Sequence, residues 1–397
     1  MENQKHKPVI MQILPALESG GVERGTIDIA KALKKTDFEP IVVSGGGILV
    51  YQLNEAKIKH IKLSVHSKNP FVIYSNIKKI ADLIIENQVE VVHVRSRAPM
   101  WSAYFACKKT NTKLLSTIHG TYSLNFLCWK VFPLKKIYNS IMLKADAMIA
   151  VSEFIKDYLI KNYQRKNKIF PLEKITVIQR GVDLDYFNFQ KVSKNRIIEL
   201  SKKWNLPDGK KIILMPARFT AWKGHEFLIE ALAKVKNNFL CVLVGSDHGH
   251  KKFRKKIENK IIKENLEGKV KIVGVCKDMP TAYAISHLVI CPSIKPEAFG
   301  RVAIEAQASS RIIIATKIGG SLETIIDGKT GFLVEPQNVE KLTELIDKVL
   351  DFSDEKTYEI ATAARAHTEE KFSNEKMCIN TIEIYKSLIS DNLKKFW

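Results

Sequence analysis

Short hydrophobic runs alternate with amphipathic segments along most of the chain, and this alternation predicts a parallel β-sheet with helices on both faces. In the first half, the segment at 22–35 has a helical pattern. The hydrophobic runs that we expect to form buried strands there are residues 9–14, 40–44, 89–94, 113–118, 147–152 and 175–178.

The same rhythm restarts after a polar stretch at 183–196, which indicates a second domain of the same α/β type. A chain of 397 residues is also too long for one ordinary hydrophobic core. We place the boundary between the domains at 188/189. The five further strands expected are residues 210–218, 239–246, 269–275, 287–293 and 311–316.

The composition is that of a globular protein without a membrane-spanning helix. Hydrophobic residues make up 45% of the chain, but no run of about 18 uncharged apolar residues occurs. Residues 1–10 are charged and lack the apolar core of a signal peptide. The six cysteines are scattered without a C-x-x-C pair, which argues against a zinc site and favours the cytoplasm.

The net charge of +21 indicates an anionic partner, whether nucleic acid, an acidic membrane or a phosphorylated substrate. The segment 91–145 has nine basic residues and no acidic one, with large aromatic residues between them. It is either an anionic-lipid interface or a solvated basic face over core aromatics. Its basic residues are Arg95, Arg97, Lys108, Lys109, Lys113, Lys130, Lys135, Lys136 and Lys144.

Candidate chemistry follows the predicted strands, at the edge where ligands bind in open α/β sheets. Gly20 and Gly21 open the helix after the first strand, where bare N–H groups attract anions, and His119 follows the strand at 113–118. Arg218 and Lys223 share one loop and suit a pyrophosphate. Two carboxylates, Glu297 and Glu305, stand eight residues apart in PEAFGRVAIE.

These residues lie in motifs that together resemble the retaining GT-B glycosyltransferases of family four. The resemblance covers nearly the whole length. Its carriers are SGGVERG at 19–25, IHGTY at 118–122, AVSEFIKDYL at 150–159, RGVDLDYF at 180–187, PARFTAWKG at 216–224, VGVCKDMPTAYAISHLVICPS at 273–293, PEAFGRVAIEAQA at 296–308 and GGSLETIIDGKTGFLV at 319–334.

The resemblance implies a donor site for a nucleotide sugar in residues 189–379. Glu305 would bind the ribose hydroxyls, and Glu297 would lie near the transferred sugar. Backbone N–H groups at Phe299 and Gly300 would meet sugar or phosphate. Arg218 and Lys223 would stabilise the leaving diphosphate, so that no metal and no other cofactor is expected. The nucleobase would contact the backbone of Gly274, Val275 and Cys276.

The resemblance also implies that residues 1–188, with a C-terminal helix at 380–397 packed back on them, bind the acceptor. His119 would touch the transferred sugar, and Gly20 and Gly21 would lie near phosphate or acceptor. The transferred sugar, a hexosyl unit, would keep in the product the anomeric configuration that it has in the donor. An envelope glycan, such as lipopolysaccharide, or a lipid-linked molecule is the expected acceptor. The expected location is the cytoplasm, as a peripheral protein on the inner membrane face.

Other interpretations remain open from the sequence. A sugar-nucleotide epimerase shares the double-domain architecture, and a nucleic-acid-binding protein would explain the charge, although no nucleic acid is expected as a partner. The acidic triplet Asp183-Leu184-Asp185 and the cluster 247–250 resemble metal ligands, but we interpret them as structural. The family usually has glycine at the position of Ser310. If the helix ends there in a left-handed cap, the serine side chain would be sterically unfavourable.

Overall fold

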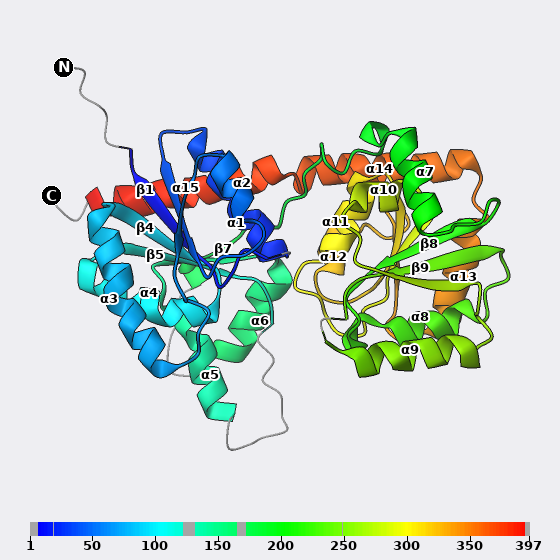
Figure 1. Cartoon of the computed structure of the whole chain (residues 1–397), viewed down its shortest axis with the longest axis horizontal. Coiled ribbons are helices and arrows are strands. Elements are labelled where there is room, and N and C mark those ends of the chain that lie inside the picture. Colours follow the sequence, from blue (N-terminus) through cyan, green and yellow to red (C-terminus); the bar gives the residue numbers. More distant parts are fainter. Residues whose placement is uncertain (1–6, 19, 122–131, 165–171, 248, 394–397) are drawn as a thin grey trace. The chain divides into compact units, whose positions relative to one another are not determined.

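The computed structural model describes residues 7–18, 20–121, 132–164, 172–247 and 249–393, and these form two compact α/β units (Figure 1). The first unit comprises Met1–Gly181 and Asn374–Trp397, and the second comprises Val182–Ser373. The boundaries expected at 188/189 and 379/380 both lie several residues C-terminal to those observed.

The first unit contains a seven-stranded parallel sheet with the strand order β3-β2-β1-β4-β5-β6-β7. Helices α1 and α2 lie on one side of this sheet, and α3 and α4 on the other (Figure 1). The strands are β1 (Val9–Ile13), β2 (Glu39–Ser44), β3 (Lys59–Lys62), β4 (Val89–Val94), β5 (Lys113–Ile118), β6 (Ala147–Ala150) and β7 (Ile175–Val177). The α-helices are α1 (Gly21–Lys34), α2 (Val50–Glu55), α3 (Pro70–Glu86), α4 (Arg97–Thr110), α5 (Phe132–Ser140), α6 (Glu153–Tyr163) and α15 (Asn374–Leu393).

The central strands form because they are β-branched or aliphatic runs that can be buried on both faces. Every residue of β1 is buried, as are five of the six residues of β2 and of β4. In this unit, the strand that the sequence did not predict is β3, whose four residues Lys-His-Ile-Lys are all exposed or half-buried. It is an edge strand, so it needs no hydrophobic run of its own.

The second unit has a six-stranded parallel sheet with the order β10-β9-β8-β11-β12-β13. Its core packs residues such as Ile213, Leu228, Leu243 and Ile314. The strands are β8 (Lys211–Pro216), β9 (Phe239–Val244), β10 (Val270–Gly274), β11 (Leu288–Cys291), β12 (Ile312–Thr316) and β13 (Phe332–Val334). The α-helices are α7 (Lys194–Lys203), α8 (His225–Leu232), α9 (Lys251–Lys263), α10 (Met279–Ala284), α11 (Arg301–Ala308), α12 (Ser321–Thr324), α13 (Val339–Leu350) and α14 (Asp354–Lys371).

The C-terminal helix α15 packs against the first unit, which confirms the expected return of the chain. Its Tyr385 is fully buried, and the phenol oxygen lies 2.6 Å from Nδ1 of His93 on β4. The other ring nitrogen of His93 lies 2.6 Å from Oγ1 of Thr117 on β5. These polar contacts sit beside an apolar cluster that includes Ile29 of α1 and Ile382 of α15. The C-terminal helix is therefore part of the hydrophobic core of this unit.

None of the helices in the described part of the chain combines the length and hydropathy needed to cross a bilayer.

Candidate functional site

The loop after β8 brings Lys223 to the end of the neighbouring strand β11. Lys223 closes a short 3-10 turn (Ala221–Lys223), and Gly224 follows with φ +77°. A side chain at Gly224 would collide with the carbonyl of Pro292, so only glycine allows the two loops to meet. The N–H of Ile294 donates to the carbonyl of Trp222 at 2.8 Å and joins the loops directly.

Glu297 forms an ion pair with Lys223 where these two loops meet. The Lys223 Nζ lies 2.6 Å from Oε1 of Glu297, and each side chain is 11% exposed. The hydroxyl of Ser293 donates to the same oxygen at 2.5 Å, and the Cys291 thiol lies 3.2 Å from it. Within the described parts of the chain, all these donors converge on Oε1. The second carboxylate oxygen, Oε2, is left available for a ligand.

The charge of Glu297 is maintained in spite of its burial. Desolvation by itself raises the pKa of a carboxyl group. The nearby Lys223 ammonium and the hydrogen bonds from Lys223, Ser293 and Cys291 outweigh it, so the pKa of Glu297 is held below its ordinary value of 4.5. Glu297 is therefore an ionised carboxylate at neutral pH, in the loop that follows β11.

Helix α11 carries the second predicted carboxylate. Gly300 precedes it with φ +95°, a conformation that favours glycine, and Glu305 lies in the second turn. The Tyr283 hydroxyl donates to Oε2 of Glu305 at 3.0 Å, and Arg301 Nη2 donates to Oε1 at 2.8 Å. Tyr283 is fully buried, so its hydroxyl orients one oxygen of the Glu305 carboxylate from the interior of the unit. Each oxygen has a second lone pair that can accept a ligand hydroxyl.

Phe299 packs its side chain into the core beside Glu297. Its ring is 3% exposed and packs edge-on against Phe372 at a centroid distance of 5.7 Å. The Gly319–Gly320 turn covers this loop, with the Gly320 N–H donating to the carbonyl of Glu297 at 2.9 Å. The loop that carries Glu297 is thus held on two sides, by Lys223 and by the glycine turn.

The remaining predicted donor residues are placed at the same edge of the sheet but make no contact with this network. Arg218 is exposed and forms no ion pair with any residue that the structure describes. Gly274 ends β10 with φ +73° and open space around it, and Val275 is 67% exposed. The thiol of Cys276 donates to the carbonyl of Asp278 at 3.3 Å. These groups are accessible for binding a ligand.

In the first unit, Gly20 and Gly21 open α1 at the end of β1, as expected. The Glu23 carboxylate lies against Gly20, and the Arg180 guanidinium donates to the carbonyl of Gly21. Arg180 is only 8% exposed and follows β7. Arg180 therefore connects the segment after β7 to the glycine turn that opens α1.

His119 lies directly after β5, and its Nε2 is buried without a partner among the described residues. Burial, and then the charges of Arg180 and Arg95, lower the pKa of His119 well below its ordinary value. The ring is therefore neutral at physiological pH. It can exchange hydrogen bonds with a hydroxyl group, but it adds no further positive charge.

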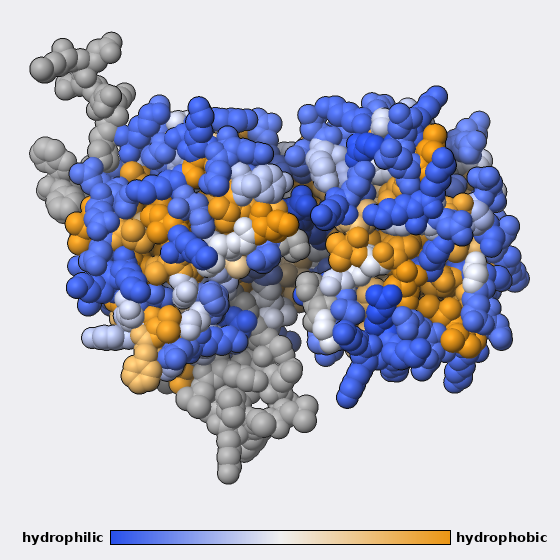
Figure 2. Space-filling model, in the orientation of Figure 1, coloured by the Kyte–Doolittle hydropathy of each residue, from blue (hydrophilic) through white to orange (hydrophobic). Residues whose placement is uncertain are grey.

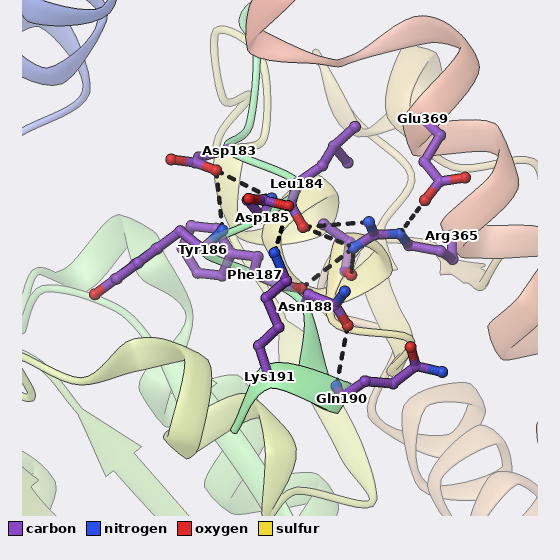
Figure 3. Close-up of polar contacts among 11 residues, drawn as sticks. Asp183, Leu184, Asp185, Tyr186, Phe187, Asn188, Gln190, Lys191, Arg365 and Glu369 are labelled. Carbon is purple, nitrogen blue, oxygen red and sulfur yellow. Dashed lines mark hydrogen bonds and ion pairs between the residues drawn. The ribbon is translucent and has the colours of Figure 1, made fainter. Parts of the chain in front are cut away.

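The acidic triplet Asp183-Leu184-Asp185, which resembles a metal motif, makes its polar contacts mainly within its own loop (Figure 3). Asp183 Oδ1 accepts the N–H groups of Asp185 and Tyr186 at 3.0 and 2.9 Å, and Asp185 pairs with Lys191 at 2.8 Å. Arg365 of α14 donates to the carbonyls of Leu184 and Phe187. In the same way, Asp247 accepts the N–H of Gly249. Among the described residues, no group of three or more His, Cys, Asp and Glu side chains could hold a metal.

Sequence reasoning missed the residues that hold the carboxylates: Ser293, Cys291, Tyr283 and Arg301. Ser293 and Cys291 stand in the run expected as a strand, and Arg301 is four residues before Glu305 on a predicted helix. The i,i+4 spacing of Arg301 was a usable signal. The hydrogen bonds to Glu297 and the one from Tyr283 depend on how strand, helix and loop pack, so the sequence carried no signal for them.

Two known families match consecutive parts of the chain. The family described as Glycosyltransferase Family 4 matches residues 19–186, and the one described as Glycosyl transferases group 1 matches residues 196–367. A crystal structure of a glycosyltransferase from Rickettsia africae ESF-5 is 43% identical, with a TM-score of 0.87. That match covers 97% of this chain and 99% of the Rickettsia chain.

More distant relatives have the same architecture. The structure of Anabaena HepE in complex with UDP-glucose is 22% identical, with a TM-score of 0.80, and the match covers 96% of this chain and 99% of that one. The capsular polysaccharide biosynthesis glycosyltransferase CapM of Staphylococcus aureus is 24% identical over 99% of both chains. Taken with the two parallel sheets and the matched motifs, these findings show that the chain belongs to the group 1 glycosyltransferases of the GT-B fold.

Proposed function

We propose that this glycosyltransferase transfers a hexosyl unit from a nucleotide-diphosphate sugar to an envelope glycan or a lipid-linked acceptor, with retention of configuration and without a metal. The observation that carries the proposal is the ion pair between Lys223 and Glu297, held at the ends of β8 and β11. At one edge of the sheet, the cation can stabilise the leaving diphosphate, and the ionised carboxylate can lie near the sugar, on the other side of the sugar–phosphate bond that breaks.

Lys223 is the proposed stabiliser of the leaving diphosphate. An ammonium has three donors, so Lys223 can keep its bond to Glu297 while it binds a phosphate oxygen. The exposed Arg218 adds a second cation from the same loop, and the start of α11 adds backbone N–H groups. Because these fixed positive charges meet the charge that develops on the leaving group, the proposed reaction needs no metal.

Glu297 and Glu305 are the proposed supports of the two ends of the donor. The free Oε2 of Glu297 accepts a hydroxyl of the transferred sugar, and its charge favours the positive character that develops at the anomeric carbon. Glu305, with one lone pair left on each oxygen, accepts the ribose hydroxyls. The backbone at 274–276 is the proposed contact to the nucleobase. The complex of HepE with UDP-glucose supports a nucleotide sugar as the donor.

Retention is proposed to follow from attack of the acceptor on the face that the diphosphate leaves. A phosphate oxygen of the donor takes the acceptor proton, so the protein needs no carboxylate nucleophile. In the first unit, neutral His119 is the proposed partner of a sugar hydroxyl, and Gly20 and Gly21 are proposed to lie near phosphate or acceptor. The name of CapM supports an envelope polysaccharide as the acceptor class.

The test is to incubate the full-length protein with UDP-, GDP- and ADP-sugars and to follow release of free sugar. We expect slow hydrolysis of one donor, unchanged by EDTA, and release of the sugar with the anomeric configuration of the donor in proton NMR. An inverted product would refute retention, and loss of turnover in EDTA would refute metal independence. An epimerase would convert the sugar nucleotide into an isomer instead. A nucleic-acid-binding protein would retain RNA and release no sugar from any donor.

We also propose a cytoplasmic, peripheral location at the inner face of the membrane. The basic segment 91–145 was the expected contact, and the structure describes it except for residues 122–131. Lys130 lies outside the described residues, as do the side chains of Phe132 and Lys135. The lipid-interface interpretation of this segment stays a prediction, to be measured by sedimentation with anionic vesicles.

A further inference from the structure

Helix α3 of the first unit exposes two aromatic side chains on its solvent face. Phe71 is 85% exposed and Tyr74 is 77% exposed. They are three residues apart, so they lie side by side on the helix surface. The opposite face of α3 packs into the unit through Ile80, Ala81 and Ile84. Figure 2 shows hydrophobic residues among hydrophilic ones over the first unit, including the region of α3.

Hydrogen bonds hold the first turns of α3, the part of the helix that carries these aromatic residues. Asn69 caps the helix by accepting the N–H of Phe71 at 2.9 Å, and Pro70 occupies the first helical position. On the inner side, the Asn76 amide donates to the carbonyl of Ser64 at 3.1 Å. The Ser102 hydroxyl of α4 donates to the carbonyl of Ile73 at 2.9 Å. The first turns of α3 are therefore anchored while its outer face stays uncovered.

Positive charge is in excess around this face. Residues 55–86 contain six lysines, against three acidic residues, Glu55, Asp82 and Glu86. Lys62, Lys68, Lys78 and Lys79 are all exposed. Lys62, Lys79 and Phe71 line one open hollow of about 540 Å³, together with Ser64 and Ser75. Two ammonium groups, two hydroxyls and an aromatic ring around one hollow match the chemistry of a phosphate ester that carries an apolar chain.

We propose that this α3 surface, made of Phe71, Tyr74, Lys62, Lys68, Lys78 and Lys79, binds anionic phospholipid head groups at a membrane surface. The lysines bind the phosphates, while the aromatic rings enter the boundary between head groups and acyl chains. The inference deepens the proposed function, because it rests on the proposed peripheral location and says which surface makes the contact.

Among the described aromatic residues of 91–145, Phe105 is 41% exposed, which is less than the exposure of Phe71 and Tyr74 on α3. The Trp101 ring stacks on Tyr138 at a centroid distance of 6.0 Å, and Lys108 and Lys144 lie over the Tyr104 ring at 5.3 and 5.2 Å. These contacts hold the rings of Trp101 and Tyr104 against other side chains of the first unit. In contrast, Phe71 and Tyr74 form no ring pair within the described residues. The α3 surface is therefore better suited to insert into an interface.

The test is sedimentation of the full chain with vesicles of phosphatidylcholine alone, or of phosphatidylcholine mixed with phosphatidylglycerol. We expect binding to the mixed vesicles only, weakened by salt. K62Q/K79Q should weaken it about 25-fold, at about fivefold for each lysine. F71S/Y74S should also weaken binding, in a way that low salt does not restore. K251Q/K252Q, which removes the same charge from α9 of the second unit, should change binding by less than about twofold.

Each outcome decides between specific alternatives. An equal loss in the K251Q/K252Q control would mean that net charge alone drives binding and would overturn the inference. A loss in K108Q/K109Q but not in the α3 variants would place the membrane contact on 91–145. If the wild-type protein fails to sediment, both the α3 inference and the peripheral location fall. Sugar release from the nucleotide-sugar panel, measured without vesicles, reports separately on glycosyl transfer.

Discussion

Lys223 Nζ lies 2.6 Å from Oε1 of Glu297, with each side chain only 11% exposed. This buried ion pair links the loop after β8 to the loop after β11. A buried ion pair adds little to the stability of a fold compared with apolar residues in the same place. Removal of one partner, however, leaves the other charge buried without a partner, which is strongly destabilising. Breaking this ion pair should therefore affect stability and, under the proposed function, also donor binding, and variants can separate the two effects.

Replacement of Lys223 by methionine should reduce the free energy of unfolding of the second unit by about 3–5 kcal/mol, because Glu297 is left as an unpaired buried charge. Sugar release should also be lost. The double variant K223M/E297Q should recover most of the stability in urea denaturation, yet remain inactive. Activity in a stable double variant would show that neither residue takes part in the reaction.

Tyr283→Phe should weaken donor binding and leave turnover at saturation nearly unchanged. The variant removes only the hydroxyl that orients Glu305, so we expect roughly a fivefold rise in the KM for the nucleotide sugar. Glu305→Ala should cost more, roughly 1.5–3 kcal/mol of nucleoside diphosphate binding measured by calorimetry. If Tyr283→Phe lowered kcat and left KM unchanged, Tyr283 would have a role other than positioning this carboxylate.

His225 should make the second unit lose stability in mild acid. Its ring stacks on Phe219 at 4.6 Å, and both ring nitrogens are buried without partners among the described residues. Burial, and then the Lys223 charge, lower the pKa of His225 from 6.5 to about 4. The unfolded chain therefore takes up a proton before the folded one does. Stability is complete above pH 6.5 and falls by about 3 kcal/mol towards pH 4.

The measurement for His225 is urea denaturation at several pH values between 7.5 and 4.5, compared with His225→Phe. The variant keeps an aromatic ring in the same place but cannot be protonated. We expect a shallower fall in stability with decreasing pH for the variant. Parallel curves for the two proteins would show that other groups cause the acid sensitivity.

Ser310→Gly should stabilise the second unit by about 1 kcal/mol, since serine pays a steric cost in the left-handed conformation. Ser310 has φ +52°, and the N–H of Arg311 donates to the carbonyl of Ala306 at 2.9 Å, as in a Schellman cap. Ser309, with φ −85°, supplies the matched control. Ser309→Gly should give no gain in thermal unfolding. A gain there equal to that at Ser310 would contradict the steric explanation.

The buried strands were predictable because hydrophobic runs that are covered on both faces leave a continuous signal in the sequence. The strands at 89–94 and 113–118 agree with β4 and β5 to the residue. At the sheet edges the signal is less regular: the edge strands β7 and β10 were predicted, but β3, with its exposed lysines, and β13, with only three residues, were not. Edge strands obtain their order from a neighbour's hydrogen bonds, which local sequence does not record.

The amino-acid sequence by itself determined the two α/β units, the family, the loops that carry Lys223, Glu297 and Glu305, and the strain expected at Ser310. These follow from patterns between near neighbours or from motifs in a fixed order. Only the tertiary structure decided that Lys223 pairs with one oxygen of Glu297, that Tyr283 supports Glu305, and that Arg180 is buried against Gly21. Such contacts join residues far apart in the chain, and they depend on packing distances that no local pattern encodes.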